Sequence, residues 1–311
     1  MKEEFFFYSK DNSKIYCTKY IPKEKLKGVV QIVHGMGENS SRYEHVALKL
    51  VKNGYGVYIH DHRGHGRTAA GKENLGHLGD GDVFLKMVYD MKEVTDIIKR
   101  ELGELPIFLL GHSMGSFLSQ KYISLFGKEL KGVLLTGTDG KKGRILDVGV
   151  ELSRKEIKRY GKRYKSKKLN RISFLNCHIA FIPNRTNFDW LTRDTKEVDK
   201  FIDDDVLGFS YDNLFYYYFF KGLKDIHKKS VMNKIPKNLP IYIFGGSKDP
   251  IGRNGRGLVM LYNMYKKIGI KNLTCKIYEN GRHEILNEKN KDYVIEDMII
   301  WINRNNKSGL I

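Results

Sequence analysis

The sequence predicts an α/β protein with a mostly parallel central sheet, helices on both faces and a helical segment inserted between two strands. Apolar strand patterns alternate with helical patterns over most of the 311 residues, as in parallel sheets whose strands are joined by helices. The alternation stops for about a hundred residues, from Asp139 to near Pro236, where the pattern is helical and rich in charge and aromatics. We therefore expect a core of residues 1–138 and 236–311, with a helical cap of residues 139–235.

The expected core strands fall into two kinds. Two early runs, residues 4–9 and 14–21, alternate in hydropathy and predict an antiparallel edge pair. The later strands are short apolar runs, which are typical of a parallel sheet covered on both faces. These runs are residues 28–33, 56–60, 107–110, 132–136, 241–244 and 273–278. Apolar residues at helical spacing predict core helices over 43–52, 82–100, 258–268 and 293–303, and another after residue 113.

Composition narrows the class of protein. No apolar run approaches the ~20 residues needed to span a bilayer, and residues 1–8 place acids before a short apolar run, unlike a signal peptide. The three cysteines, Cys17, Cys177 and Cys275, are widely separated and lack metal-ligand spacing. We expect reduced thiols, no metal site and a cytoplasmic protein.

The net charge of +19 is unevenly distributed. Between Lys141 and Arg171, 13 basic residues stand against three acidic ones, and the pairs Arg154-Lys155, Lys158-Arg159 and Lys162-Arg163 recur every four residues. On a helix these pairs predict one positive face, which can attract an anionic membrane surface. The alternative is a solvated face in a lysine-rich protein. No recognition motif accompanies the charge, so nucleic acid is not expected as a partner.

The stretch Gly111-His112-Ser113-Met114-Gly115 joins a buried strand to a helix. The G-x-S-x-G pattern arises by chance too often to be decisive, so its context matters. Here a strand ends at the serine and a helix leaves it, while the glycines permit close backbone packing. This is the arrangement of a nucleophile elbow, in which Ser113 would be the nucleophile.

Asp249 and His283 are the expected partners of Ser113. A serine hydroxyl is a poor nucleophile unless a base accepts its proton and a third group orients that base. Both residues follow predicted strands, and the order serine, acid, histidine is the one that this elbow requires. Asp139, which follows an earlier strand, is the alternative acid. Glu284 is expected to be structural, because a side chain adjacent to His283 cannot easily reach its ring.

Two backbone N–H groups are expected to stabilise the negatively charged oxygen that forms during attack. One belongs to Met114, directly after the serine. The other is expected from the loop His34-Gly35-Met36-Gly37-Glu38, whose glycines allow amides to face the site. Met36 is the best candidate in that loop.

Taken together, these motifs resemble the monoacylglycerol lipase and lysophospholipase family of α/β-hydrolases. The resemblance is carried by Val33–Tyr43, Asp61–Gly66, Gly111–Gly115, Asn187–Asp194, Asp249–Gly252 and Arg282–Glu288, which are spread over most of the chain. It implies an α/β-hydrolase fold in which the insertion is a lid whose apolar residues shape an acyl tunnel. Asn39 stands where the family usually has histidine, and Ser116 stands where glycine is common. Neither residue touches the chemistry, but Asn39 is expected near the site and leaves the head-group preference open.

The resemblance also implies a polar end of the pocket near Glu38 and Arg42, and His112 is grouped with them as a substrate-binding candidate. Glu38 and Arg42 forming a structural ion pair is the equal alternative. The aromatic run Leu214–Phe220 must be buried between cap and core or face a ligand.

We expect a cofactor-independent serine hydrolase that cleaves carboxylic esters of single-chain lipids through an acyl-enzyme intermediate, with peripheral membrane contact through residues 141–171. Three alternatives stay open. An aminopeptidase-like enzyme would need cap acids, such as Asp203, Asp204 and Asp205, to hold a substrate amine. The others are a short-chain carboxylesterase and a non-catalytic membrane-associated binding protein. Serine at the elbow disfavours dehalogenases and epoxide hydrolases, which carry aspartate there.

Overall fold

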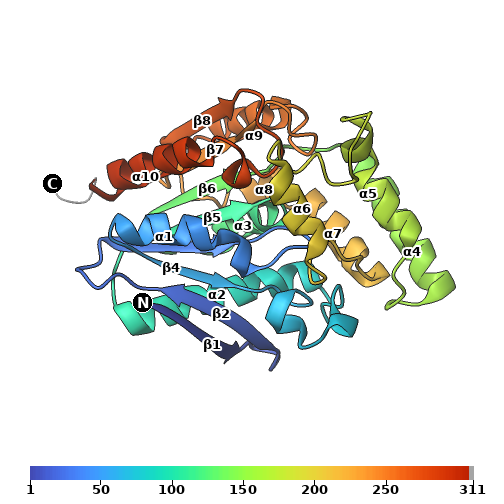
Figure 1. The fold of residues 1–311 in the computed structure, drawn as a ribbon, viewed down its shortest axis with the longest axis horizontal. Helices are drawn as coiled ribbons and strands as arrows, with labels where there is room; N and C mark the ends of the chain where they lie inside the picture. The colour runs from blue at the N-terminus through green and yellow to red at the C-terminus, as the bar shows by residue number, and fades with distance from the viewer. Residues whose placement is uncertain (308–311) are drawn as a thin grey trace.

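An eight-stranded sheet forms the centre of the computed structural model, which describes residues 1–307 (Figure 1). The strand order is β1-β2-β4-β3-β5-β6-β7-β8. The pairs β1–β2 and β2–β4 are antiparallel, and every other pair is parallel. The strands are β1 (Lys2–Tyr8), β2 (Lys14–Tyr20), β3 (Gly28–Val33), β4 (Tyr55–His60), β5 (Ile107–His112), β6 (Gly132–Thr136), β7 (Ile241–Gly246) and β8 (Leu273–Tyr278). The predicted fold class, including its antiparallel edge, is confirmed.

Helices cover both faces of the sheet, which explains the continuous apolar strands. In β5, Leu109 packs into an apolar cluster with the helices on one face of the sheet, whereas Phe108 and Leu110 pack into a second cluster with the helices on the other face. Both faces of the strand are therefore buried, as a parallel sheet requires. The core helices are α1 (Glu44–Lys52), α2 (Val83–Leu102), α3 (Met114–Phe126), α9 (Arg256–Lys267) and α10 (Lys291–Lys307). Short 3-10 helices are η1 (Ser40–Tyr43), η2 (Gly66–Ala69), η3 (Lys72–Asn74), η4 (Gly127–Glu129) and η5 (Ile285–Asn287).

Five helices and no strand lie between β6 and β7. They are α4 (Ile145–Tyr160), α5 (Lys167–Ile179), α6 (Thr195–Asp203), α7 (Asn213–Asp225) and α8 (Lys229–Met232). We call residues 139–235 the cap. In Figure 1, α6 and α7 lie beside the sheet, and α4 and α5 lie beyond them at one end of the molecule. Across residues 1–307, no helix combines the length and apolar character needed to cross a membrane.

The basic cap helix is shorter than the charge pattern predicts. Gly161 ends α4 with a φ of 88°, a left-handed conformation that favours glycine. The pairs Arg154-Lys155 and Lys158-Arg159 therefore lie on α4, but Lys162-Arg163 lies beyond its end. The predicted continuous face of three pairs is corrected to two pairs followed by a basic loop.

Helix α7 joins the cap to the core at one close crossing. A Cβ placed on Gly222 would lie 2.4 Å from the Phe84 ring of α2, so no other residue fits without a shift. Phe219, one turn before Gly222, also contacts Phe84, with ring centroids 6.2 Å apart. Part of the aromatic run is thus buried between the cap and the core, which is the first of the two predicted roles.

Replacing Gly222 with alanine should lower the free energy of unfolding by about 1–3 kcal/mol, because overpacking against Phe84 costs that much. Alanine favours a helix over glycine by only about 1 kcal/mol. Urea unfolding of Gly222→Ala and of the exposed neighbour variant Lys221→Ala measures the difference. A Gly222→Ala protein at least as stable as the wild type would contradict the close crossing.

Candidate active site

Ser113 lies alone in the turn between β5 and α3, with φ 51° and ψ −119°. A positive φ is uncommon outside glycine and costs of order 1 kcal/mol or more. The flanking glycines make the turn possible. A Cβ on Gly115 would lie 2.1 Å from the Val33 carbonyl oxygen, and one on Gly111 would lie 2.4 Å from Ser119 Oγ. The G-x-S-x-G pattern here therefore reflects a backbone packed too closely for side chains.

Three side chains from distant loops form a hydrogen-bonded series. His283, after β8, lies with Nε2 2.9 Å from Ser113 Oγ and with Nδ1 2.9 Å from Asp249 Oδ1. Because a carboxylate oxygen accepts, Nδ1 carries the proton and Nε2 is left to accept from the serine hydroxyl. Asp249 and His283 are buried. Asp249 Oδ1 also accepts the Ile251 N–H at 2.9 Å, which fixes the carboxylate in its loop.

Asp139, the alternative acid, has other partners. Its Oδ1 accepts from Arg253 Nε at 3.0 Å and from another guanidinium nitrogen at 2.6 Å. Burial raises the pKa of this carboxyl against the lowering effect of Lys142 and Arg253. No hydrogen bond joins Asp139 to His283 in the described chain, so the geometry pairs the histidine with Asp249.

Ser113 opens into a cavity of about 570 Å³, within the usual range for small-molecule sites. The cap supplies most of its apolar wall, through Leu146, Leu152, Phe174, Phe188, Trp190, Leu191, Phe201, Phe209, Phe219, Phe220 and Leu223. Ile145, Val148 and Ile172 also line the cavity and are exposed to solvent. Part of the aromatic run, Phe219 and Phe220, therefore faces the cavity, which is the second of the two predicted roles.

Met36 and Met114, the two candidate N–H donors, both line the cavity together with Ser113. His34 Nδ1 donates to the Gly35 carbonyl at 2.8 Å. Since that carbonyl shares a planar peptide with the Met36 N–H, the bond also fixes where the N–H points. His34 Nε2 accepts the His62 N–H at 2.9 Å. Burial lowers the pKa of His34, consistent with a neutral ring that carries its proton on Nδ1.

Glu38 and His112 line the cavity and bind each other. Glu38 Oε1 lies 3.0 Å from His112 Nδ1 and accepts the Tyr43 hydroxyl at 2.7 Å and the Gly35 N–H. Burial on its own would raise the pKa of Glu38, but His112 and then Arg42 hold it below its usual range. The same pairing outweighs burial at His112 and raises the pKa of that ring.

Arg42 is not among the residues that line the cavity. Its Nε lies 3.4 Å from Glu38 Oε2, and its guanidinium also bonds the carboxylate of Glu284. Arg42 is thus held between two buried carboxylates, which is the ion-pair arrangement predicted from the sequence as the alternative. Glu284 takes the structural position expected for it, next to His283 but directed away to Arg42.

Cap backbone contacts the histidine loop, a feature that sequence reasoning missed. The Trp190 carbonyl accepts the His283 N–H at 3.3 Å, and the Leu191 carbonyl accepts the Glu284 N–H at 2.7 Å. The Trp190 ring lies 5.1 Å from the His283 ring, centroid to centroid. The motif Asn187–Asp194 marks the segment in the sequence, but hydropathy patterns do not report contacts between loops.

Comparison with known proteins places this chain in a family. The model described as serine aminopeptidase, S33, matches residues 24–290. The chain belongs to this family. Human monoglyceride lipase is 26% identical over 304 residues, covering 94% of this chain and 88% of that protein. The resemblance to the monoacylglycerol lipase group of α/β-hydrolases is confirmed.

Two further proteins are similar to this chain. A monoglyceride lipase homologue of monkeypox virus is 39% identical over 112 residues, a match that covers 36% of this chain but only 38% of the viral protein. The structure of a highly thermostable carboxyl esterase from Bacillus coagulans, in complex with glycerol, superposes with a TM-score of 0.92 at 29% identity. It covers 98% of this chain and 99% of its own. The likeness therefore includes the cap as well as the core.

The pKa of His112 should fall on Glu38→Gln substitution, because the carboxylate stabilises the protonated ring. Because the pKa of His112 is higher in the folded than in the unfolded protein, the pair stabilises the fold. This contribution is complete below the unfolded-state pKa of about 6.5, and it is lost as the pH rises through the folded-state pKa. NMR titration of the imidazole measures the change. The exposed variant Glu73→Gln is the control, and an unchanged His112 pKa in Glu38→Gln would contradict the pairing.

Proposed function

We propose that the protein is a serine hydrolase that cleaves carboxylic esters of single-chain lipids through an acyl-enzyme intermediate. The observation that carries this proposal is the series Ser113 Oγ, His283 Nε2 and Asp249 Oδ1, with both contacts at 2.9 Å, at a largely apolar cavity. A nucleophile, a base and an orienting acid are the three parts that acyl transfer by serine requires.

In the proposed reaction, Ser113 Oγ attacks the ester carbonyl as His283 Nε2 takes its proton. Asp249 holds the ring and stabilises its positive charge, while the Met36 and Met114 N–H groups bind the oxyanion. Collapse of the intermediate breaks the ester bond, and His283 protonates the departing alcohol. Water then attacks the acyl-serine with His283 again as base, which releases the fatty acid and restores Ser113.

The charges around the cavity favour an ester over an aminoacyl substrate, although the family description names an aminopeptidase. A substrate amine needs a free carboxylate. Glu38 and Glu284 both bind Arg42, and Asp139 faces Arg253. The candidate acids Asp203, Asp204 and Asp205 do not line the cavity. An apolar chain, in contrast, meets the aromatic and aliphatic wall of the cap, and the human relative is named monoglyceride lipase.

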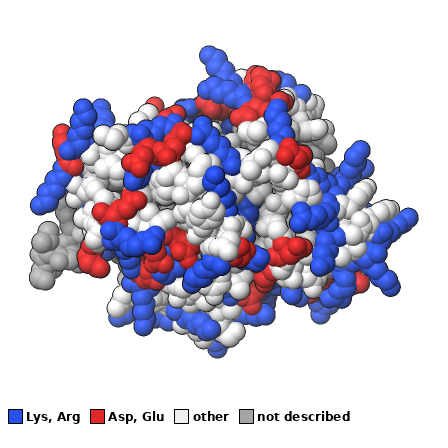
Figure 2. All heavy atoms as spheres, turned by 90° about the horizontal axis from the view of Figure 1, so that it is seen from below, with Lys and Arg blue, Asp and Glu red and all other residues white. Residues whose placement is uncertain are grey.

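We further propose that residues 139–235 act as a lid that contacts anionic membrane. Ile145 and Val148 lie on α4, which also carries the two basic pairs, and Ile172 lies on α5; all three are exposed and line the cavity. Figure 2 shows Lys and Arg among uncharged side chains at the end of the molecule that carries α4 and α5. Apolar contact and cation attraction act together at lipid surfaces. The unpaired thiols Cys17, Cys177 and Cys275 favour a reducing, cytoplasmic location.

Ser113→Ala should abolish both turnover of p-nitrophenyl butyrate and labelling by a fluorophosphonate, because the nucleophile is gone. The expected loss in kcat is about 10⁶-fold. The measurement is steady-state hydrolysis together with gel detection of the label. Turnover by Ser113→Ala at the wild-type rate would exclude the proposed function, and no activity in either protein would favour a binding protein.

Asp249→Asn should lower kcat by about 10⁴-fold, because the amide no longer holds the productive histidine tautomer. Asp139→Asn is the matched control, since it removes the alternative acid with the same change of charge. We expect it to retain kcat within about tenfold, since the Asp139 carboxylate bonds Arg253 and the Gly140 N–H rather than His283. The reverse order of the two losses would assign the acid to Asp139.

Replacing Lys155, Lys158 and Arg159 with glutamine should weaken binding to phosphatidylserine vesicles more than 100-fold, because each cation contributes about 1 kcal/mol at an anionic surface. The control replaces Lys23, Lys25 and Lys27, which precede β3 at the opposite end of the parallel strands from Ser113. Vesicle co-sedimentation measures both. Equal losses in the two variants would leave the cap without a special role at the membrane.

A further inference from the structure

Two hydrogen bonds from the cap hold Gly37, the residue after the candidate oxyanion donor Met36. The Gly37 N–H donates to the Tyr211 hydroxyl at 2.5 Å, and its carbonyl accepts the Gly208 N–H at 2.8 Å. Both partners lie between α6 and α7. The core loop of residues 34–38, which we call the oxyanion loop, is therefore held by two hydrogen bonds from the cap.

The Tyr211 hydroxyl has a second partner that fixes its own orientation. It lies 2.5 Å from His65 Nε2, while His65 Nδ1 lies 2.7 Å from the Arg63 carbonyl. A carbonyl accepts, so Nδ1 carries the proton and Nε2 accepts from the tyrosine. Burial lowers the pKa of His65, in keeping with a neutral ring. The series runs in one direction, from the Gly37 N–H through the Tyr211 O–H to His65.

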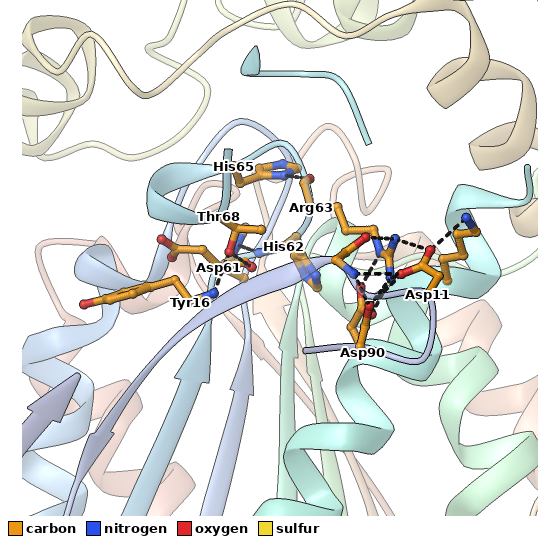
Figure 3. A network of polar contacts seen from close by, with 12 residues as sticks. Asp11, Tyr16, Asp61, His62, Arg63, His65, Thr68 and Asp90 are labelled. Carbon is orange, nitrogen blue, oxygen red and sulfur yellow. Dashed lines mark hydrogen bonds and ion pairs between the residues drawn. The ribbon is translucent and has the colours of Figure 1, made fainter. Parts of the chain in front are cut away.

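His65 belongs to a turn that is itself held to the core (Figure 3). In that turn, Arg63 Nε bonds Asp90 Oδ2 at 2.6 Å, and Arg63 also bonds Asp11. Asp61 Oδ1 accepts the Ser40 N–H at 2.8 Å, which ties the turn to the segment following the oxyanion loop. The turn therefore holds His65 in place, and His65 in turn fixes the position of the Tyr211 hydroxyl.

We propose that Tyr211 is a positioning residue for the hydrolytic reaction. The two peptides that flank the Met36 Cα are each held by one group: His34 bonds the carbonyl of the first, and Tyr211 bonds the N–H of the second. Gly37 has a φ of +70° and, as a glycine, would sample other conformations without that bond. Tyr211 therefore holds the peptide that follows Met36, and together with His34 it limits how far the Met36 N–H can turn. This inference rests on the proposed function.

Tyr211→Phe removes the hydroxyl and keeps the ring. With p-nitrophenyl acetate, a short ester that needs little of the cap's apolar wall, we expect kcat to fall about tenfold, less than the 10²–10³-fold loss of a whole donor. We expect KM to change by less than about twofold, because the interaction is made in the transition state. Affinity for a trifluoromethyl ketone, whose adduct with Ser113 carries the oxyanion, should fall by the same factor as kcat.

Tyr216→Phe is the matched control. Tyr216 is buried on α7 and donates to Asn170 Oδ1 at 3.0 Å, so this variant loses one buried cap hydrogen bond that does not touch the oxyanion loop. We expect its kcat and inhibitor affinity to equal those of the wild type. The double variant Tyr211→Phe/His65→Leu leaves no histidine nitrogen unpaired, which limits destabilisation, and it should show the same loss of kcat as Tyr211→Phe.

Two results would overturn the proposal: equal kcat in Tyr211→Phe and Tyr216→Phe, or a loss in Tyr211→Phe that lies in KM alone. Thermal denaturation of each variant shows whether it is folded. If Tyr211→Phe is unfolded, the kcat of the double variant Tyr211→Phe/His65→Leu is compared with that of Tyr216→Phe instead. A wild type no more active than Ser113→Ala is a different outcome. It would remove the proposed function, and the role of Tyr211 with it.

Discussion

The turn at Ser113 depends on two glycines that let backbone segments approach more closely than side chains allow. Gly111 and Gly115 have no room for a Cβ, and Ser113 between them adopts a positive φ. Gly115 packs against the carbonyls of Val33 and His34, so the glycine that permits the turn also seats the oxyanion loop. The placement of the serine hydroxyl and of both candidate N–H donors thus follows from one close packing of strand, turn and loop.

The cap divides into a docked inner part and an exposed outer part. The backbone of Trp190 and Leu191 bonds the His283 loop, Gly208 and Tyr211 bond Gly37, and α7 crosses α2 without room for a side chain. Through these contacts, the inner part of the cap helps to hold the His283 loop and the oxyanion loop in place. Helices α4 and α5 instead present exposed apolar residues beside basic ones, which suits the part that would meet a lipid surface.

Sequence patterns predict what depends on local chemistry. The strands follow from apolar runs, and the positions of Ser113, Asp249 and His283 follow from their order at strand ends. The predicted extent of the basic helix was wrong, because Gly161 ends α4 before the third basic pair. The ion pair of Arg42 with Glu38, four residues away, was one of the two predicted interpretations. Its second carboxylate, from Glu284, and the contacts of Tyr211 could not be predicted, because these partners come from distant segments. Tyr211 has no local pattern that separates it from the other 18 tyrosines.

We propose that this site hydrolyses esters whose acyl chain fills an apolar cavity lined mainly by the cap. The most direct measurement is kcat/KM of the wild type on a matched panel: monoacylglycerols and lysophospholipids with acyl chains of increasing length, an acetyl ester and an aminoacyl amide. We expect kcat/KM to rise with acyl length on the lipid esters and to be lowest on the amide. A preference for the acetyl ester or for the amide would contradict the claim.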